Sequence, residues 1–218
     1  SSAASDVYKR QPAQGEFRIE TQLEQAALTF SPDWPKIDRI RGALTFERAG
    51  MAVRAESAEL SGVRLRDIHA RIEDFARPVL EIDGQAAGAL RSMLDFVDAS
   101  PLRSGVDPLV RDWQIDGDAE LALRLDIGLG AGGRTDYRGR LGLAGNRVQT
   151  GPGQPVLSAI EGEVSFDRSG IHARSLTGEL LGGPVQAKLD APAGGHLRLE
   201  AQGLALAGRI AGLFGIDA

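Results

Sequence analysis

The sequence predicts a mainly β fold: a long, curved antiparallel sheet built from repeats, with two short helices. Three observations indicate this class. Apolar and polar residues alternate in short runs, residues 37–62 recur as residues 157–182, and 28 of the 218 residues are glycine. Alternation is typical of strands with one buried face, and repetition favours an extended array. Glycine within strands permits the bends and bulges that a curved sheet requires.

The predicted strands follow one another along the chain. Their apolar positions, in chain order, are Phe17, Ile19 and Leu23; Ile40, Leu44 and Phe46; Met51 and Val53; Leu80 and Ile82; and Ala119, Leu121, Leu123, Leu125 and Ile127. The last run is the clearest, because Glu120, Arg124 and Asp126 stand between its apolar residues. Such a strand presents one apolar face and one solvated face.

The alternation changes phase once, between Leu65 and Ile68, and we expect a bulge or a turn there. Two segments instead have the three- and four-residue spacing of a helix. We predict short helices near 88–99 and near 206–214. Their apolar residues are Leu90, Met93, Leu94 and Val97 in the first and Leu206, Ile210, Leu213 and Phe214 in the second.

The internal repeat is specific. Residues 37–62 align with residues 157–182 without a gap, and nine of the 26 positions are identical. Chance matching at ~6% per position would give only about one or two. Gly50 aligns with Gly170 in this repeat, and at both positions we expect a tight hairpin with a residue of positive φ. With a shift of 117 residues, the following strands and the two helical segments also coincide.

These patterns give a domain organisation. We predict a first β repeat over residues 12–150 and a second, truncated repeat over residues 151–218. Residues 1–11 hold one of three lysines and one of two tyrosines, and we interpret them as a foreign or disordered leader. Because the sequence stops in apolar residues, we expect it to be a piece of a longer protein.

Composition excludes several functional classes. The absence of cysteine excludes disulfide frameworks, thiolate nucleophiles and cysteine-ligated metals. The formal charge is −5 and the basic residues are scattered, so nucleic acid is not an expected partner. No stretch approaches the ~18 consecutive apolar residues that span a membrane.

A series of individually weak motifs occurs in a specific order. The motifs are Trp34-Pro35, Ile40-x-Gly42-x-Leu44-x-Phe46, Gly50, Gly62, Pro78-x-Leu80-x-Ile82-x-Gly84, Gly88, Pro101-Leu102 and Gly117-x-x-x-Leu121-x-Leu123-x-Leu125. In this order they resemble the central region of YhdP-type AsmA-like proteins, over roughly residues 16–218.

The resemblance implies a taco-shaped β groove, anchored in the inner membrane of a Gram-negative bacterium, that crosses the periplasm and carries phospholipid toward the outer membrane. The family's membrane anchor and most of its length are missing from this sequence. Contact with both membranes is therefore expected from parts of the parent protein outside this chain.

Elementary energetics agrees with such a groove. About ten strands with one apolar face each need cover, which two short helices cannot supply. The aliphatic character of that face suits phospholipid acyl chains, its expected partner. The residues expected to line it are Leu44, Phe46, Val53, Leu80, Ile82, Leu121, Leu123, Leu125, Val164, Phe166, Leu197 and Leu199. The alternative is a closed β-sandwich that acts as an envelope scaffold or binding module.

Other chemistries have weaker support. The glycine run 128–133 matches GxGxxG, but a strand pattern rather than a helix follows it, so we expect a hairpin loop and no nucleotide. Asp116, Asp118 and Glu120 are expected to share one flat strand face, which does not enclose a cation.

The histidines and tryptophans give no enzyme motif. His69, His172 and His196 lie in separate segments without metal-ligand spacing. Trp34 and Trp113 are candidates for stacking on a sugar, but no carboxylate pair at cleft spacing accompanies them. We therefore expect no catalytic residue, no metal and no cofactor.

Overall fold

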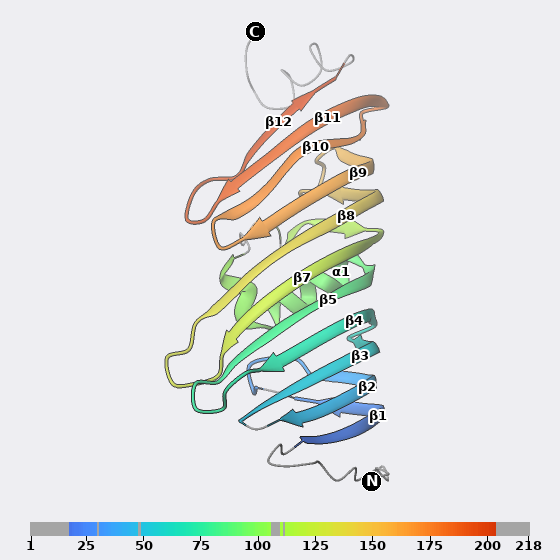
Figure 1. Ribbon diagram of the computed structural model, residues 1–218. Helices are drawn as coiled ribbons and strands as arrows, with labels where there is room; N and C mark the ends of the chain where they lie inside the picture. Colours follow the sequence, from blue (N-terminus) through green and yellow to red (C-terminus); the bar gives the residue numbers. More distant parts are fainter. Residues whose placement is uncertain (1–17, 30, 48, 106–109, 111, 204–218) are drawn as a thin grey trace.

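The computed structural model describes residues 18–29, 31–47, 49–105, 110 and 112–203, and they form one antiparallel sheet with one short α-helix (Figure 1). The strands are β1 (Arg18–Leu28), β2 (Ile37–Glu47), β3 (Gly50–Leu60), β4 (Val63–Ile72), β5 (Val79–Ala89), β6 (Gln114–Asp116), β7 (Asp118–Gly128), β8 (Thr135–Gln149), β9 (Val156–Asp167), β10 (Gly170–Leu180), β11 (Gly183–Pro192) and β12 (Arg198–Gln202). The helix α1 (Leu90–Asp98) and the 3₁₀ turn η1 (Pro101–Gly105) follow β5.

The order of strands in the sheet follows their order in the chain. It runs from β1 to β12, and only the short β6 leaves this path, to pair with β8. The path does not return to its first strand, so the sheet is open. The mainly β, antiparallel class is confirmed, and the alternative of a closed sandwich is wrong for the described residues.

The register aligns the predicted alternation across the strands. Directly paired residues share a face of the sheet. One row of paired residues runs Leu44, Val53, Ala70, Ile82, Leu125 and Tyr137. We call the face that carries this row the apolar face. The opposite, polar face carries cross-strand pairs such as Arg71–Glu81, with 2.9 Å between Nη2 and Oε2.

The repeat extends further in the structure than in the sequence. Pairing of Ile19 with Phe46 between β1 and β2 recurs 120 residues later as pairing of Gly139 with Phe166 between β8 and β9. A bulge residue with positive φ also recurs, Arg39 (52°) in β2 and Ala159 (48°) in β9. The backbone of β8 is therefore equivalent to that of β1, upstream of the 26 aligned residues.

Bulges bend the strands. The phase change expected between Leu65 and Ile68 is a bulge at Asp67, with φ of 50° and a register shift in the pairing of β4 with β5. The prediction is confirmed. Bulges increase the local twist and bend of a strand, which gives the sheet its curvature.

The glycines at two hairpins have different roles from those predicted. Gly62 and Gly182 have φ of 82° and 80° and form the two-residue turns β3–β4 and β10–β11. Positive φ at Gly170 (139°) is as expected, but Gly50 has none, so that prediction was wrong. A Cβ on Gly50 would lie 2.4 Å from the carbonyl oxygen of Ile72, so close approach of β4 explains this glycine.

The helix lies over the centre of the apolar face, behind β5 and β7 in Figure 1. At nine residues, without a capping side chain, α1 is too short to be stable alone. Packing holds it, because Leu90 and Met93 are buried against β4 and β7. The second predicted helix, near 206–214, and the leader 1–11 lie outside the described residues.

Candidate functional site

The candidate site is the apolar face. The register places the predicted lining residues of β2, β3, β5, β7, β9 and β12 on this one face, and Leu197 immediately precedes β12. Paired positions continue it through Leu141 on β8 and Leu189 on β11. The face is therefore a continuous apolar surface across the sheet.

A cover shields the centre of this face. We define the cover as α1, η1 and Trp34, which lies in the connection between β1 and β2. Trp34 is 5% exposed and its ring centroid is 6.1 Å from that of Phe96. Beneath the cover, Leu80 and Leu125 are 4% and 5% exposed.

The predicted lining residues therefore fall into two groups. Leu80, Ile82, Leu121, Leu123 and Leu125 pack in the two clusters that contain α1. The flanks carry the others, which are Leu44, Phe46 and Val53 on one side and Val164, Phe166, Leu197 and Leu199 on the other. Of these, Val53 is buried, at 7% exposure. Exposure rises toward the end of the sheet and reaches 56% at Leu199.

The flank at β8 and β9 has an aromatic floor. A Cβ on Gly139 would lie 2.3 Å from Cζ of Phe166, so this glycine makes room for the ring. The Tyr137 ring lies 6.4 Å from it. Burial raises the pKa of the Tyr137 hydroxyl, and the nearby Arg168 guanidinium opposes that shift. Arg168 and Tyr137 line the same depression at this end of the strands.

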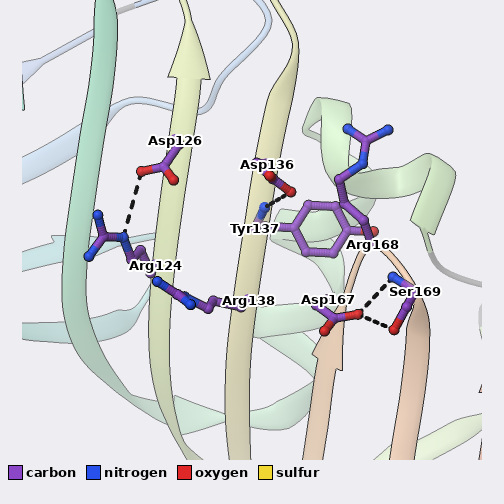
Figure 2. A pocket seen from close by; sticks show the side chains of 8 residues that line it. All are labelled: Arg124, Asp126, Asp136, Tyr137, Arg138, Asp167, Arg168 and Ser169. Carbon is purple, nitrogen blue, oxygen red and sulfur yellow. Dashed lines mark hydrogen bonds and ion pairs between the residues drawn. The ribbon is translucent and has the colours of Figure 1, made fainter.

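Figure 2 shows a depression at the strand ends beside this flank. Arg124, Asp126, Asp136, Tyr137, Arg138, Asp167, Arg168 and Ser169 line it. Most of its strand residues alternate with the row of Leu125 and Tyr137, so the depression opens mainly on the polar face. Its carboxylates serve local structure. Asp167 accepts hydrogen bonds from the backbone N–H and the hydroxyl of Ser169, and these bonds lower its pKa. They fix the β9–β10 turn.

The other candidate residues do not converge. His69 and His172 pair across strands with Asp83 and Asp190, with Nδ1 to oxygen distances of 3.9 and 2.6 Å. His196 lies in the β11–β12 turn. Asp116 and Asp118 do not share one strand as expected, because Gly117, with φ of 99°, separates β6 from β7.

The structure tests two further predictions, those for the glycine run and for the tryptophans. The glycine run is a hairpin loop, as predicted: Gly128 N–H donates to Arg134 O at 2.9 Å, and strand β8 follows. Trp34 is too buried to stack on a sugar, so that candidate role was wrong. Trp113 is partly buried against the cluster of Leu90 and Met93.

Comparison with known proteins decides the family. A family model described as YhdP protein matches residues 3–214. The chain belongs to the YhdP family. The protein of Escherichia coli strain K12 described as intermembrane phospholipid transporter YhdP is 28% identical over 172 residues. That match covers 79% of this chain but only 14% of the relative, and no solved structure matches.

The YhdP match confirms the resemblance drawn from the ordered motifs. It includes residues 3–11 of the expected leader, whose separate origin stays a prediction. Within the described part of this YhdP-family chain, no helix has the length and apolar character needed to cross a membrane.

Proposed function

We propose that this chain is one segment of a hydrophobic groove that carries phospholipids through the periplasm between the inner and outer membranes. The parent protein would be anchored in the inner membrane by parts outside this chain. One observation carries the proposal: the apolar face continues from β1 to β12 with uncovered flanks. The name of the E. coli relative, an intermembrane phospholipid transporter, supports the choice of phospholipid as cargo.

The groove would act without covalent chemistry. Two acyl chains of about 16 carbons cost on the order of 25 kcal/mol to bring fully into water, at ~0.8 kcal/mol per CH₂. A continuous aliphatic floor removes most of that barrier, while headgroups stay at the wet opening. Lipid movement then follows the strand order.

The cover sets how lipid meets the centre of the face. Acyl chains reach the exposed flank residues directly, but at Leu80 and Leu125 they compete with Phe96, Val97 and Trp34 for the same apolar contacts. When an acyl chain takes the place of the cover, the apolar face stays out of water, so the net change in transfer free energy is small. A lipid can therefore replace the cover at low cost, provided that α1 moves aside.

Photo-crosslinking tests the proposal. A photoreactive residue at position 123 of the full-length protein that carries this segment is expected to capture phospholipid in cells. Ala122 is the matched control, because it lies on the adjacent strand position and faces the polar side. Capture at 123 and not at 122 supports the groove. No lipid at 123, 44 or 199 from a folded protein would reject it and favour an envelope scaffold.

A substitution gives an independent test. Leu123→Arg is expected to abolish phospholipid transfer while the sheet stays folded, because Leu123 is only partly buried and a long side chain can carry its charge to the surface. Ala122→Arg is the control and should transfer lipid normally. Transfer between labelled and unlabelled vesicles measures the effect, with circular dichroism for the fold. Unchanged transfer by a folded Leu123→Arg protein would contradict the groove.

A further inference from the structure

One rim of the sheet differs in charge from the other. Five hairpin turns lie at the first rim, between β2 and β3, β4 and β5, β7 and β8, β9 and β10, and β11 and β12. Three of them carry an arginine that the structure describes: Arg77, Arg134 and Arg168. We call these residues the arginine rim. At the opposite rim, the turns 61–62, 150–155 and 181–182 contain no charged residue, whereas the β1–β2 connection carries Asp33 and Lys36 and the segment from α1 to β6 carries residues of both signs.

The internal repeat has arginine at the same sequence position in both copies. Arg168 occupies the position of Arg48 in the first copy, one of the nine identities between residues 37–62 and 157–182. Successive turns on one rim are two strand spacings apart, or about 10 Å. Arg77, Arg134 and Arg168 lie in three successive turns and therefore follow one another along the direction of the sheet.

Contacts between turns hold this rim as one ordered edge. Phe75 N–H donates to Ala49 O at 2.8 Å, and Leu129 N–H donates to Pro78 O at 2.9 Å. Ala193 N–H donates to Ser169 O at 2.8 Å, which is the equivalent of the first bond in the second copy. The Arg168 guanidinium completes the series by donating from Nη1 to Thr135 O at 2.7 Å. All five turns are thus linked to a neighbour.

Two of the three arginines have no close ion-pair partner among the described residues. Arg77 has a side chain 90% exposed and a distant partner, Asp74, at 4.0 Å. Arg134 makes no ion pair among the residues that the structure describes. The nearby carboxylates keep their negative charge: Asp74 accepts the Ala76 N–H and Asp167 accepts the Ser169 N–H, and Asp126 and Asp136 line the same depression as Arg168.

The rim is also apolar enough to touch lipid. Phe75 is 47% exposed and Val79 is 44% exposed, on either side of Arg77. Arg168 and the partly buried Tyr137 line the same depression, and the Tyr137 ring packs with the cluster of Leu125 and Ile127. An arginine next to exposed apolar side chains can hold an anion while its stem remains in apolar surroundings.

We propose that the arginine rim binds the phosphate groups of phospholipids whose acyl chains lie on the apolar face. The inference rests on the proposed function and adds a polarity to it: headgroups follow the arginine rim and not the opposite rim. Guanidinium forms charge-assisted, bidentate hydrogen bonds with phosphate, and the ~10 Å spacing lets one lipid pass from one turn to the next.

The test compares lipids with and without phosphate. The 218-residue chain is titrated with dihexanoyl phosphatidylglycerol and with dihexanoylglycerol, which share acyl chains. The triple variant Arg77→Gln, Arg134→Gln, Arg168→Gln is expected to bind the phospholipid about tenfold more weakly at low salt and to bind the neutral lipid as before. The triple variant to Lys keeps the charge but loses the bidentate geometry, so it should recover only part of the loss. Higher salt should shrink the difference.

A matched control carries the same change of charge elsewhere. Arg54→Gln, Arg66→Gln, Arg174→Gln alters three exposed arginines of the polar face and should bind both lipids normally. Equal phospholipid binding by the rim and control variants would overturn the inference and leave the groove standing. Equal loss of both lipids in the rim variant would overturn it too. Inorganic phosphate that binds the rim as tightly as the phospholipid would show a free-anion site instead. Binding of neither lipid by the unmodified chain would reject the groove and the rim together.

Discussion

Trp34→Ala is expected to lower the free energy of unfolding by about 3–5 kcal/mol. The indole is 5% exposed and packs with Phe96, Leu80 and Leu102, so alanine leaves a cavity where two chain segments meet. The connection between β1 and β2 would lose its main attachment to α1. Urea unfolding of the 218-residue chain measures the change.

Phe75→Ala is the matched control for this substitution. It also removes a large aromatic ring, but that ring is 47% exposed and its residue keeps the backbone bond from Phe75 N–H to Ala49 O. We expect a change within about 0.5 kcal/mol. Similar losses for the two variants would show that Trp34 does not hold the cover to the sheet.

Asn146→Ala is expected to cost about 3 kcal/mol, from several buried polar groups left without partners. Asn146 is 0% exposed. Its Nδ2 donates to Asp118 O at 3.0 Å and to Asp116 O at 3.4 Å, and its Oδ1 accepts the Ala144 N–H at 3.0 Å. The amide thus joins β8 to the break between β6 and β7.

The same variant should also loosen α1. Gly117, which lies against Asn146, accepts the Leu90 N–H at 3.0 Å, so the amide supports the first turn of the helix indirectly. Hydrogen exchange is expected to accelerate in α1 before it does in β1 to β3. Gln149→Ala, which loses one exposed bond from Nε2 to Gln154 O, is the control and should change stability by less than about 1 kcal/mol. Equal effects of the two would contradict the bridging role.

The sequence predicted the parts of the fold that depend on local pattern. Alternation at Leu121, Leu123 and Leu125 permits only one strand register, because a register shift of one residue would expose all three leucines to solvent. The bulge at Asp67 was visible for the same reason. In contrast, the equivalence of β1 with β8 depends on backbone pairing, and Ile19 against Gly139 shows why sequence comparison missed it.

Local sequence pattern could not predict the cover or the contacts that attach it to the sheet. Burial of Trp34 depends on α1, more than 50 residues later in the chain. The spacing of apolar residues within a segment does not predict such a long-range contact. Asn146 gave one unused signal, as the only asparagine of the chain. Gly50 was misread because crowding by a third strand and a positive φ both select glycine.

The coincidence of chain order and strand order has a mechanical consequence. A pull between β1 and β12 acts across the strands, along the interstrand hydrogen bonds, so all the bonds of one strand pair share the load. If one pair separates, the turn that connects its strands still joins them covalently. The sheet can therefore lengthen under tension by separation of one strand pair, and the pair can form again when the tension falls.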